Sequence, residues 1–280
     1  MLHRTVLISI ICILVAGVDR GQEAAHKQLV LDFEGNKIFS SKQLLDVSSK
    51  CLAKPAHLRN GYDAGYVDYC LRKVKSFLFD NGYLRAKIGE PRQQETESTI
   101  RVVVPIDEGA LYRLGDVKIE GSKLLGPAQI LQMLSLKPGD VAKAESLSEW
   151  AYGRVKKAYE TFGYMQYSAS LEPVFQLESG AGEGVVDFIV TVDEGEAFVI
   201  RSIKFEGDGS VPEDELRKEM LVRIGEVFNK ELFDESLKRI SQTGQFEVID
   251  ADKDVDYRGD NEGTRLDLII HLKKKSTILE

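Results

Sequence analysis

The chain repeats itself, and the repeat is the feature that most limits what it can fold into. An apolar residue followed by Glu-Gly occurs at Phe33-Glu34-Gly35, Ile119-Glu120-Gly121 and Phe205-Glu206-Gly207. The steps are equal, since 121 − 35 = 86 and 207 − 121 = 86. A triplet Asp-Glu-Gly ends at Gly109 and at Gly195, again 86 residues apart, and Gly82, Gly163 and Gly244 follow one another at steps of 81. Three series in one register indicate a tandem array of one unit.

The repeat divides the 280 residues into three units of roughly 80 residues, a size that buries only a thin core. The net charge is −8 and no basic stripe is present, which argues against nucleic acid as a partner. An array of small modules is more often a binding or scaffolding surface than an enzyme.

The first residues are predicted to be a signal peptide with a short leader, over 1–25. His3 and Arg4 supply the positive end, residues 6–15 form an apolar run, and Ala16 and Gly17 offer small residues for cleavage. The run is short for a membrane span, which needs about 20 residues, although an uncleaved anchor remains an alternative. We therefore expect an exported protein.

Loss of the signal leaves two cysteines, Cys51 and Cys70, both in predicted helices of the first unit. An even pair in an oxidising compartment suggests a disulfide between them. The alternative is two buried thiols packed as small hydrophobic residues.

Each unit is predicted to open with a strand that ends at a glycine turn, over 29–33, 114–119 and 200–205. A first helix and a longer amphipathic helix follow, and the second helix stops at its own glycine. Ser40 and Gln43 have the spacing of a capping box, as do Ser210 and Glu213.

Two more strands are predicted to complete the unit. The first starts at the aromatic residue behind the helix-ending glycine, over 83–88, 164–171 and 246–251. Polar loops are expected over 92–99, 178–184 and 256–263. The closing strands alternate apolar with other residues over 100–106, 186–192 and 266–272.

The resulting order predicts an α+β fold of three tandem βααββ modules. The last two strands should pair as an antiparallel hairpin, and the closing strand, which is richest in aliphatic residues, should be central in a three-stranded mixed sheet. Both helices should cover one face. The predicted modules are 26–109, 110–195 and 196–275, with a tail over 276–280 and links of about two residues.

These residues resemble the POTRA (polypeptide-transport-associated) domain. The resemblance is carried by a βααββ unit, a second helix that runs into Gly-Tyr, and a closing strand that ends in Asp-Glu-Gly. The nearest matches are Asn81-Gly82-Tyr83, Phe162-Gly163-Tyr164 and Asp193-Glu194-Gly195, and Gly244-Gln245-Phe246 resembles a variant with one intervening residue.

The resemblance implies the periplasmic arm of outer-membrane protein assembly factors of the BamA and TamA type. Such arms receive unfolded outer-membrane proteins and dock accessory subunits, and a membrane β-barrel follows them. This chain departs from the pattern, because no series of about ten-residue alternating segments follows the third unit. A fragment of a longer protein and a stand-alone array both remain open, and with them the barrel as a partner.

Exposed sheet edges are the predicted binding sites, because an edge strand offers free N–H and C=O groups to an incoming extended chain. The candidate client-binding residues lie on the second strands: Tyr83, Leu84, Ala86, Tyr164, Met165, Tyr167, Phe246 and Val248. The alternative is that these edges are solvated or covered by the next module.

No cofactor, metal or catalytic residue is predicted, and we expect no enzyme. Asp250, Asp252, Asp254 and Asp256 alternate, but the glycine and closing glutamate of a calcium loop are missing, which favours a solvated acidic edge. Trp150, Tyr66, Tyr159 and Phe162 are expected to be core residues. The leading hypothesis is a scaffold that binds unfolded client chains by β-augmentation; the alternative is an architectural spacer in the cell envelope.

Overall fold

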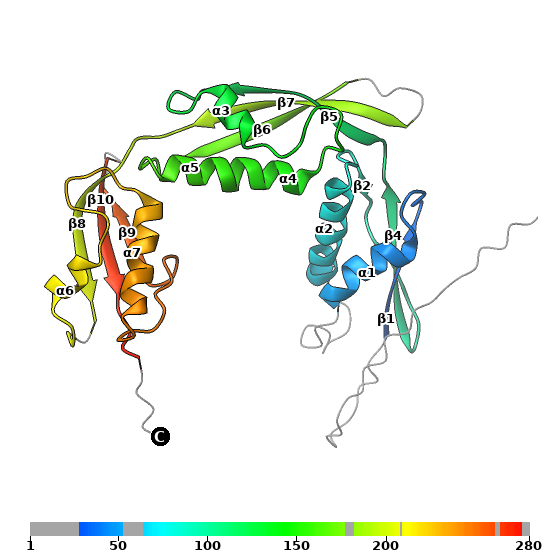
Figure 1. The fold of residues 1–280 in the computed structure, drawn as a ribbon. Helices are drawn as coiled ribbons and strands as arrows, with labels where there is room; N and C mark the ends of the chain where they lie inside the picture. The colour runs from blue at the N-terminus through cyan, green and yellow to red at the C-terminus, as the bar shows by residue number, and fades with distance from the viewer. Residues whose placement is uncertain (1–27, 53–63, 177–181, 208, 261–263, 276–280) are drawn as a thin grey trace, which may run out of the picture.

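The computed structural model describes residues 28–52, 64–176, 182–207, 209–260 and 264–275, which form three successive sheets with their helices (Figure 1). We call residues 28–107 module 1, residues 111–193 module 2 and residues 199–271 module 3. The predicted signal segment, residues 1–25, lies outside the described residues.

Each module repeats one series of elements. Module 1 contains β1 (Gln28–Glu34), α1 (Ser41–Leu52), α2 (Ala64–Asp80), β2 (Lys87–Ile88), β3 (Arg92–Glu95) and β4 (Thr99–Asp107). Module 2 contains β5 (Leu111–Glu120), α3 (Pro127–Gln132), α4 (Ala144–Ser148), the π-helical η2 (Glu149–Val155), α5 (Lys156–Glu160), β6 (Ser168–Phe175) and β7 (Glu183–Asp193). Module 3 contains β8 (Val199–Glu206), α6 (Glu213–Lys218), α7 (Lys230–Gln242), β9 (Val255–Gly259) and β10 (Arg265–His271).

The sheet topology confirms the predicted βααββ modules. The closing strands β4, β7 and β10 are central; each pairs in parallel with the opening strand of its module and antiparallel with the hairpin strand. Module 1 differs in that two short strands, β2 and β3, take the place of one hairpin strand on β4. The central strand of module 2 alternates buried and more exposed residues along most of its length, as its sequence pattern predicts.

The predicted second strands, and the predicted polar loops of modules 1 and 3, were wrong in position, while residues 178–181 of the predicted loop at 178–184 lie outside the described residues. Of residues 83–88 only Lys87–Ile88 is strand, β6 begins at Ser168, and residues 246–251 form no strand beyond a single bridge at Phe246. The chain forms a further turn after the glycine, before the strand starts. In module 1 this turn is closed by the hydrogen bond from the N–H of Ala86 to the carbonyl of Tyr83 (3.0 Å). The polar stretches at 92–95 and 256–259 are strand instead, because an edge strand needs no apolar face.

One predicted capping box is present and one is absent. The backbone N–H of Ser40 donates to Oε1 of Gln43 (3.0 Å), and the N–H of Gln43 donates to Oγ of Ser40 (3.3 Å). In module 3 the helix begins at Glu213 behind Pro212. The residue that precedes a proline is disfavoured in the helical region, so the helix cannot start directly after Ser210.

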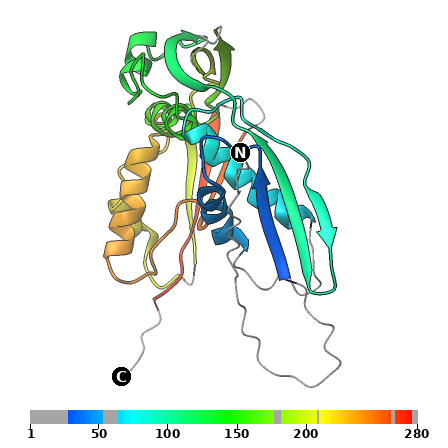
Figure 2. The same cartoon turned by 90° about the vertical axis from the view of Figure 1, so that its right-hand side faces the viewer.

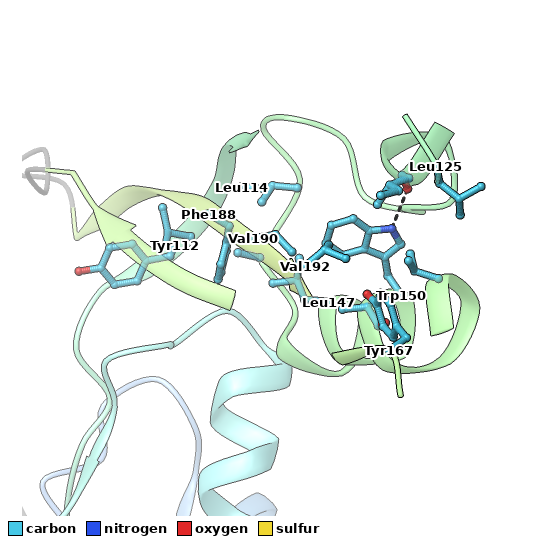
Figure 3. Packing of buried hydrophobic residues seen from close by; sticks show 14 of the residues in the cluster. Tyr112, Leu114, Leu125, Leu147, Trp150, Tyr167, Phe188, Val190 and Val192 are labelled. Carbon is cyan, nitrogen blue, oxygen red and sulfur yellow. Dashed lines mark hydrogen bonds between the residues drawn. The ribbon is translucent and has the colours of Figure 1, made fainter. Parts of the chain in front are cut away.

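The core of module 2 is built around the only tryptophan of the chain (Figure 3). Trp150 is fully buried and its indole N–H donates to the carbonyl of Ile130 (2.9 Å), so its polar atom is satisfied. Tyr159 is also fully buried, which confirms its predicted core role. Phe162 was predicted as core but is 49% exposed, because the helix ends at Glu160 and its face no longer turns toward the sheet.

The modules form an arch in which module 2 spans the top and modules 1 and 3 extend the same way from its two ends (Figures 1 and 2). The helices α2 and α7 lie on the inner side of the arch (Figure 1). Among the described residues, no helix combines the length and the apolar character that crossing a membrane requires.

Candidate functional sites at the module elbows and the sheet edges

The predicted client-binding residues do not lie on edge strands; they lie in the turns between the second helix and the sheet. We call these turns elbow 1 (residues 82–86), elbow 2 (residues 163–167) and elbow 3 (residues 244–248). Each begins with a glycine at positive φ: 88° at Gly82, 87° at Gly163 and 76° at Gly244. A side chain there would cost about 1–2 kcal/mol from the backbone conformation alone.

Elbow 1 divides its side chains between two modules. The half-buried Tyr83 ring packs edge-on against Phe39 with centroids 5.4 Å apart, and Ala86 is buried in the module 1 core. Burial raises the pKa of the Tyr83 hydroxyl, with the charge of Glu108 adding to the effect. Leu84, by contrast, packs against the core of module 2. Leu84 therefore lies at the contact between the two modules.

Elbow 2 repeats this division. Tyr164 packs against the module 2 core, and Tyr167 is buried with its hydroxyl donating to the carbonyl of Ala151 (3.2 Å). Burial raises the pKa of Tyr167 to about 12. Met165, which is equivalent to Leu84, packs against the core of module 3. Leu84 and Met165 thus both pack against the module that follows their own.

Elbow 3 differs from the other two. Phe246 is buried against Leu216 and Ile240 of its own module, while Val248 is 83% exposed. Of the eight predicted residues, Val248 alone is a largely exposed hydrophobic side chain.

The two joints between modules share one backbone contact. At joint 1 the N–H of Tyr112 donates to the carbonyl of Gly82 (2.9 Å), and at joint 2 the N–H of Phe198 donates to the carbonyl of Gly163 (3.0 Å). A Cβ on Gly82 would lie 2.5 Å from Cγ1 of Val141, and one on Gly163 would lie 2.8 Å from Cγ1 of Val227. The glycines are therefore required both by their backbone conformation and by the closeness of the next module.

Joint 1 carries two further contacts. Oδ1 of Asp80 accepts a hydrogen bond from the backbone N–H of Glu145 (2.8 Å), in the first turn of α4. The guanidinium of Arg85 lies over the ring of Phe175, 5.5 Å from its centroid. Nothing in the residue types predicted these contacts, since they depend on how the modules are oriented.

The glutamates of the Asp-Glu-Gly triplets are structural anchors that the sequence marked only as repeat positions. Glu108 is 3% exposed and accepts from the backbone N–H groups of residues 37–39. Glu194 accepts from the N–H groups of Lys123 and Leu124 and from the hydroxyl of Tyr159 (2.6, 2.8 and 2.8 Å). Burial alone raises the pKa of Glu194, but these donors outweigh it and bring the pKa below its ordinary value.

The outer edge of β6 is the clearest open edge of module 2. The N–H of Gln176 donates to the carbonyl of Val185 (2.9 Å), which fixes the phase of the β6–β7 ladder. The alternation of an antiparallel ladder then turns the N–H groups of Ala169, Leu171 and Phe175 away from β7. Residue 173, in the same phase, is a proline, which removes one outward donor without breaking the ladder.

The acidic series of module 3 builds a turn. Asp250 accepts from the N–H of Asp252 (3.0 Å) and pairs with Lys253 (2.7 Å), while Asp254 accepts from the N–H of Asp250 (3.0 Å) and pairs with Lys273 (2.6 Å). The lysine hydrogen bonds are the largest cause of the lowered pKa of both carboxyls. Within the described part of the chain, no group of three or more His, Cys, Asp or Glu residues could hold a metal ion.

The predicted disulfide stays a prediction as to its pairing. Cys70 is fully buried on α2 and is disulfide-bonded. Cys51 belongs to the last turn of α1, and its side chain lies outside the described residues.

Comparisons with known proteins agree with this architecture. Residues 112–195 and 198–275 match the family model POTRA, described as surface antigen variable number repeat. The outer membrane protein assembly factor BamA of Neisseria meningitidis is 23% identical over 268 residues, which are 93% of this chain and 32% of that protein. A putative outer membrane protein assembly factor of Treponema pallidum is 23% identical over 254 residues, which are 88% of this chain and 29% of that protein.

The chain thus spans about a third of the length of these curated relatives. Among solved structures, the Haemophilus influenzae BamA POTRA3-5 fragment is similar with a TM-score of 0.65 and 22% identity, covering 92% of this chain and 99% of that one. This likeness shows that the whole three-module fold is shared.

Proposed function

Because the chain belongs to the POTRA family, we propose that it acts in outer-membrane protein assembly, on the periplasmic side of that membrane. The relatives that match over most of its length are named as assembly factors of the outer membrane, which supports this role. In this proposal the array is a scaffold and not an enzyme, it is exported behind the signal segment at residues 1–25, and its partners are unfolded outer-membrane proteins, envelope assembly subunits and, where the native chain continues, a membrane β-barrel.

The proposed mode of binding is β-augmentation along the outer edge of β6. An incoming extended chain would accept hydrogen bonds from the outward N–H groups of Ala169 and Leu171 without a requirement on its side chains. Such pairing suits a carrier of many different sequences. The proposal rests on the backbone N–H groups of β6 that point away from β7. Pro173 supports it, because it limits pairing farther along the edge.

Two opposite substitutions test this edge. Ala169→Pro removes an outward donor, and we expect an unfolded outer-membrane protein to bind the full-length chain about fivefold more weakly, as for the loss of one hydrogen bond. Pro173→Ala restores a donor and should strengthen binding by a similar factor. Client affinity is measured by fluorescence anisotropy, and thermal unfolding checks that both variants stay folded. Equal affinities for wild type and both variants would exclude β6.

A spacer function is the second candidate, and the additional contacts at joint 1 favour it. A chain that only positions its neighbours needs a fixed angle between modules, and Asp80 and Arg85 supply contacts that restrict this angle. The spacer model predicts no saturable binding of unfolded outer-membrane proteins, so the same titration separates the two functions.

A further inference from the structure

The long helical segment of module 2 contains one residue more between its buried positions than the helices of the other modules. On α2 the buried residues follow one another at steps of three, one and three, at Val67, Cys70, Leu71 and Val74. On α7 the same steps separate Phe233, Ser236, Leu237 and Ile240. In module 2 the last step is four, at Leu147, Trp150, Ala151 and Val155. The additional residue lies within η2 and accounts for its π-helical turn, whose hydrogen bonds span one residue more than those of an α-helix.

The lengthened turn carries an exposed aromatic residue. Tyr152, which follows the buried Ala151, is 51% exposed, whereas the equivalent residues of α2 and α7 are the charged Arg72 and Lys238. In the same turn Nε of Arg154 is buried and has no hydrogen-bond partner among the described residues. An unpaired buried donor lowers stability, so the stability of module 2 does not explain this turn. Turns of π-helix are frequent at functional sites.

Tyr152 lies on the side of the helix layer that borders β6. Among the described elements η2 contacts β6, while α3 contacts β5 on the opposite edge of the sheet. The hydroxyl of Tyr167, the residue before β6, donates to the carbonyl of Ala151 (3.2 Å). Burial is the main cause of the raised pKa of Tyr167, and Tyr152 is near enough to add to it. The exposed ring therefore lies close to the start of the β6 edge.

A strand that pairs with β6 places every second side chain on the face that the helices cover. Ala169 and Leu171, whose N–H groups point outward, are half-buried on this face. Residues directly opposite one another in a ladder have their side chains on the same face, so the partner of Ala169 points toward the helix layer. The small side chain of Ala169 leaves room there, since module 1 has Ile88 at the equivalent position of its sheet.

We propose that Tyr152 selects among the chains that pair with β6, by packing against an aromatic side chain opposite Ala169. The favoured segment alternates apolar with polar residues and carries an aromatic residue on its apolar side. Strands of outer-membrane barrels alternate in this way and have aromatic residues near their ends, so an unfolded barrel strand has the required pattern. The inference rests on the proposed function of the β6 edge and adds a residue that gives this edge a sequence preference.

A pair of labelled peptides tests the preference. Both have about ten residues, with valine alternating with serine or threonine, and they differ only in a phenylalanine or an alanine at one central apolar position. Fluorescence anisotropy with the full-length chain should show that the phenylalanine peptide binds about fivefold more tightly, as expected for an aromatic pair. Tyr152→Ser should bring the two affinities together without weakening the alanine peptide, and Tyr152→Phe should keep the difference. The matched control is Tyr69→Ser, at a 45% exposed tyrosine of α2, which should leave both affinities unchanged.

Failure of this inference is distinguishable from failure of the proposed function. If Ala169→Pro weakens both peptides and Tyr152→Ser leaves their ratio as in the wild type, β6 binds the chain and Tyr152 does not select it. If neither peptide binds saturably, pairing at β6 is excluded and the selection by Tyr152 with it. Thermal unfolding confirms that each variant is folded, which is expected because both substituted tyrosines are exposed.

Discussion

Joint 1 and joint 2 are the same backbone contact with different side chains around it. Both place a glycine carbonyl under the N–H of an aromatic residue, and both seat a valine over that glycine. At joint 1, Asp80 and Arg85 reach into module 2, whereas the equivalent residues at joint 2 are Thr161 and Gln166. Thr161 donates to the carbonyl of Ala158 in its own module. The repeat therefore fixes where the modules meet, whereas the side chains around the contact decide how firmly they are held.

Helix capping shows the same difference. The N-cap position of α4 is Lys143, whose side chain makes no capping bond, and the first turn of α4 takes its acceptor from Asp80 of module 1. The equivalent position in module 3 is Asn229, whose side chain accepts from the N–H of Leu232 (3.0 Å). Module 2 therefore depends on module 1 to complete a helix, while module 3 completes its own. We expect modules 1 and 2 to move together and module 3 to reorient more freely.

The largest effect is expected from a methyl group at a joint glycine. Gly82→Ala combines a strained positive φ with a Cβ 2.5 Å from Val141, which together should lower the free energy of unfolding by about 3 kcal/mol. Gly244→Ala is the matched control, because it has a similar φ and no neighbour within 4 Å among the described residues, so about 1 kcal/mol is expected. Urea denaturation measures both; equal losses would show that joint 1 is not tightly packed.

The second-largest loss of stability is expected when the carboxylate of Glu194, which anchors a loop, is removed. Glu194→Gln removes the charge that accepts three hydrogen bonds, and we expect module 2 to lose about 2 kcal/mol at neutral pH. The pKa of Glu194 is lowered in the folded state, so its stabilisation is present above the unfolded pKa of about 4.3 and is lost as the pH falls through the lower folded pKa.

The difference between Glu194→Gln and the wild type should therefore shrink as the pH falls below about 4. Glu172→Gln, at an exposed residue of β6, is the control and should change stability little at any pH. Chemical denaturation at pH 7 and at pH 3.5 checks the prediction, and a pH-independent loss would refute the role of the ionised carboxylate. In module 3, Lys274 stands at the position equivalent to Glu194, so the glutamate itself is not repeated there.

Much of the fold could be predicted from the sequence, because the residues that repeat are required by the local backbone conformation or by the burial of one face of a strand. The helix-ending glycines need a positive φ, and the alternation of the closing strands follows from burial of one face, so both are readable without knowledge of the neighbours. The number of modules, their strand order and the central strand were therefore correct.

The surroundings of the candidate client-binding residues were less predictable, because they depend on contacts between modules. Tyr83 and Leu84 are adjacent and both apolar in character, yet one packs in its own module and the other in the next. The hairpin strands were placed too early because an aromatic residue behind a glycine has high strand propensity, whereas here it packs back on the core within a turn. The anchoring role of Glu108 depends on N–H groups some 70 residues away, which no local pattern reveals.

Removal of the cap donated by module 1 should have a moderate effect. Asp80→Ala leaves the first turn of α4 without its acceptor and should cost about 1 kcal/mol, with faster hydrogen exchange at the N–H of Glu145. Thr161→Ala, at the equivalent position of joint 2, should leave module 3 unchanged. Adding Lys143→Asn to the Asp80→Ala variant gives α4 its own cap, as Asn229 does for α7, and should restore the protection of Glu145. Failure of this rescue would show that Asp80 acts otherwise than as a cap.

The smallest effect is expected from the cation–π contact. Arg85→Gln makes joint 1 more like joint 2 and should lower stability by only about 0.5 kcal/mol, because Arg85 is exposed and water competes for its charge. Its consequence should appear in the angle between modules: residual dipolar couplings should show modules 1 and 2 aligning less strictly as one body. Gln166→Arg at joint 2 is the matched control and should leave the alignment of module 3 unchanged, because an arginine alone does not recreate the aromatic ring that Phe175 supplies. If Arg85→Gln leaves the couplings of modules 1 and 2 as they are, the firmness of joint 1 resides in Asp80 and the glycine contact alone.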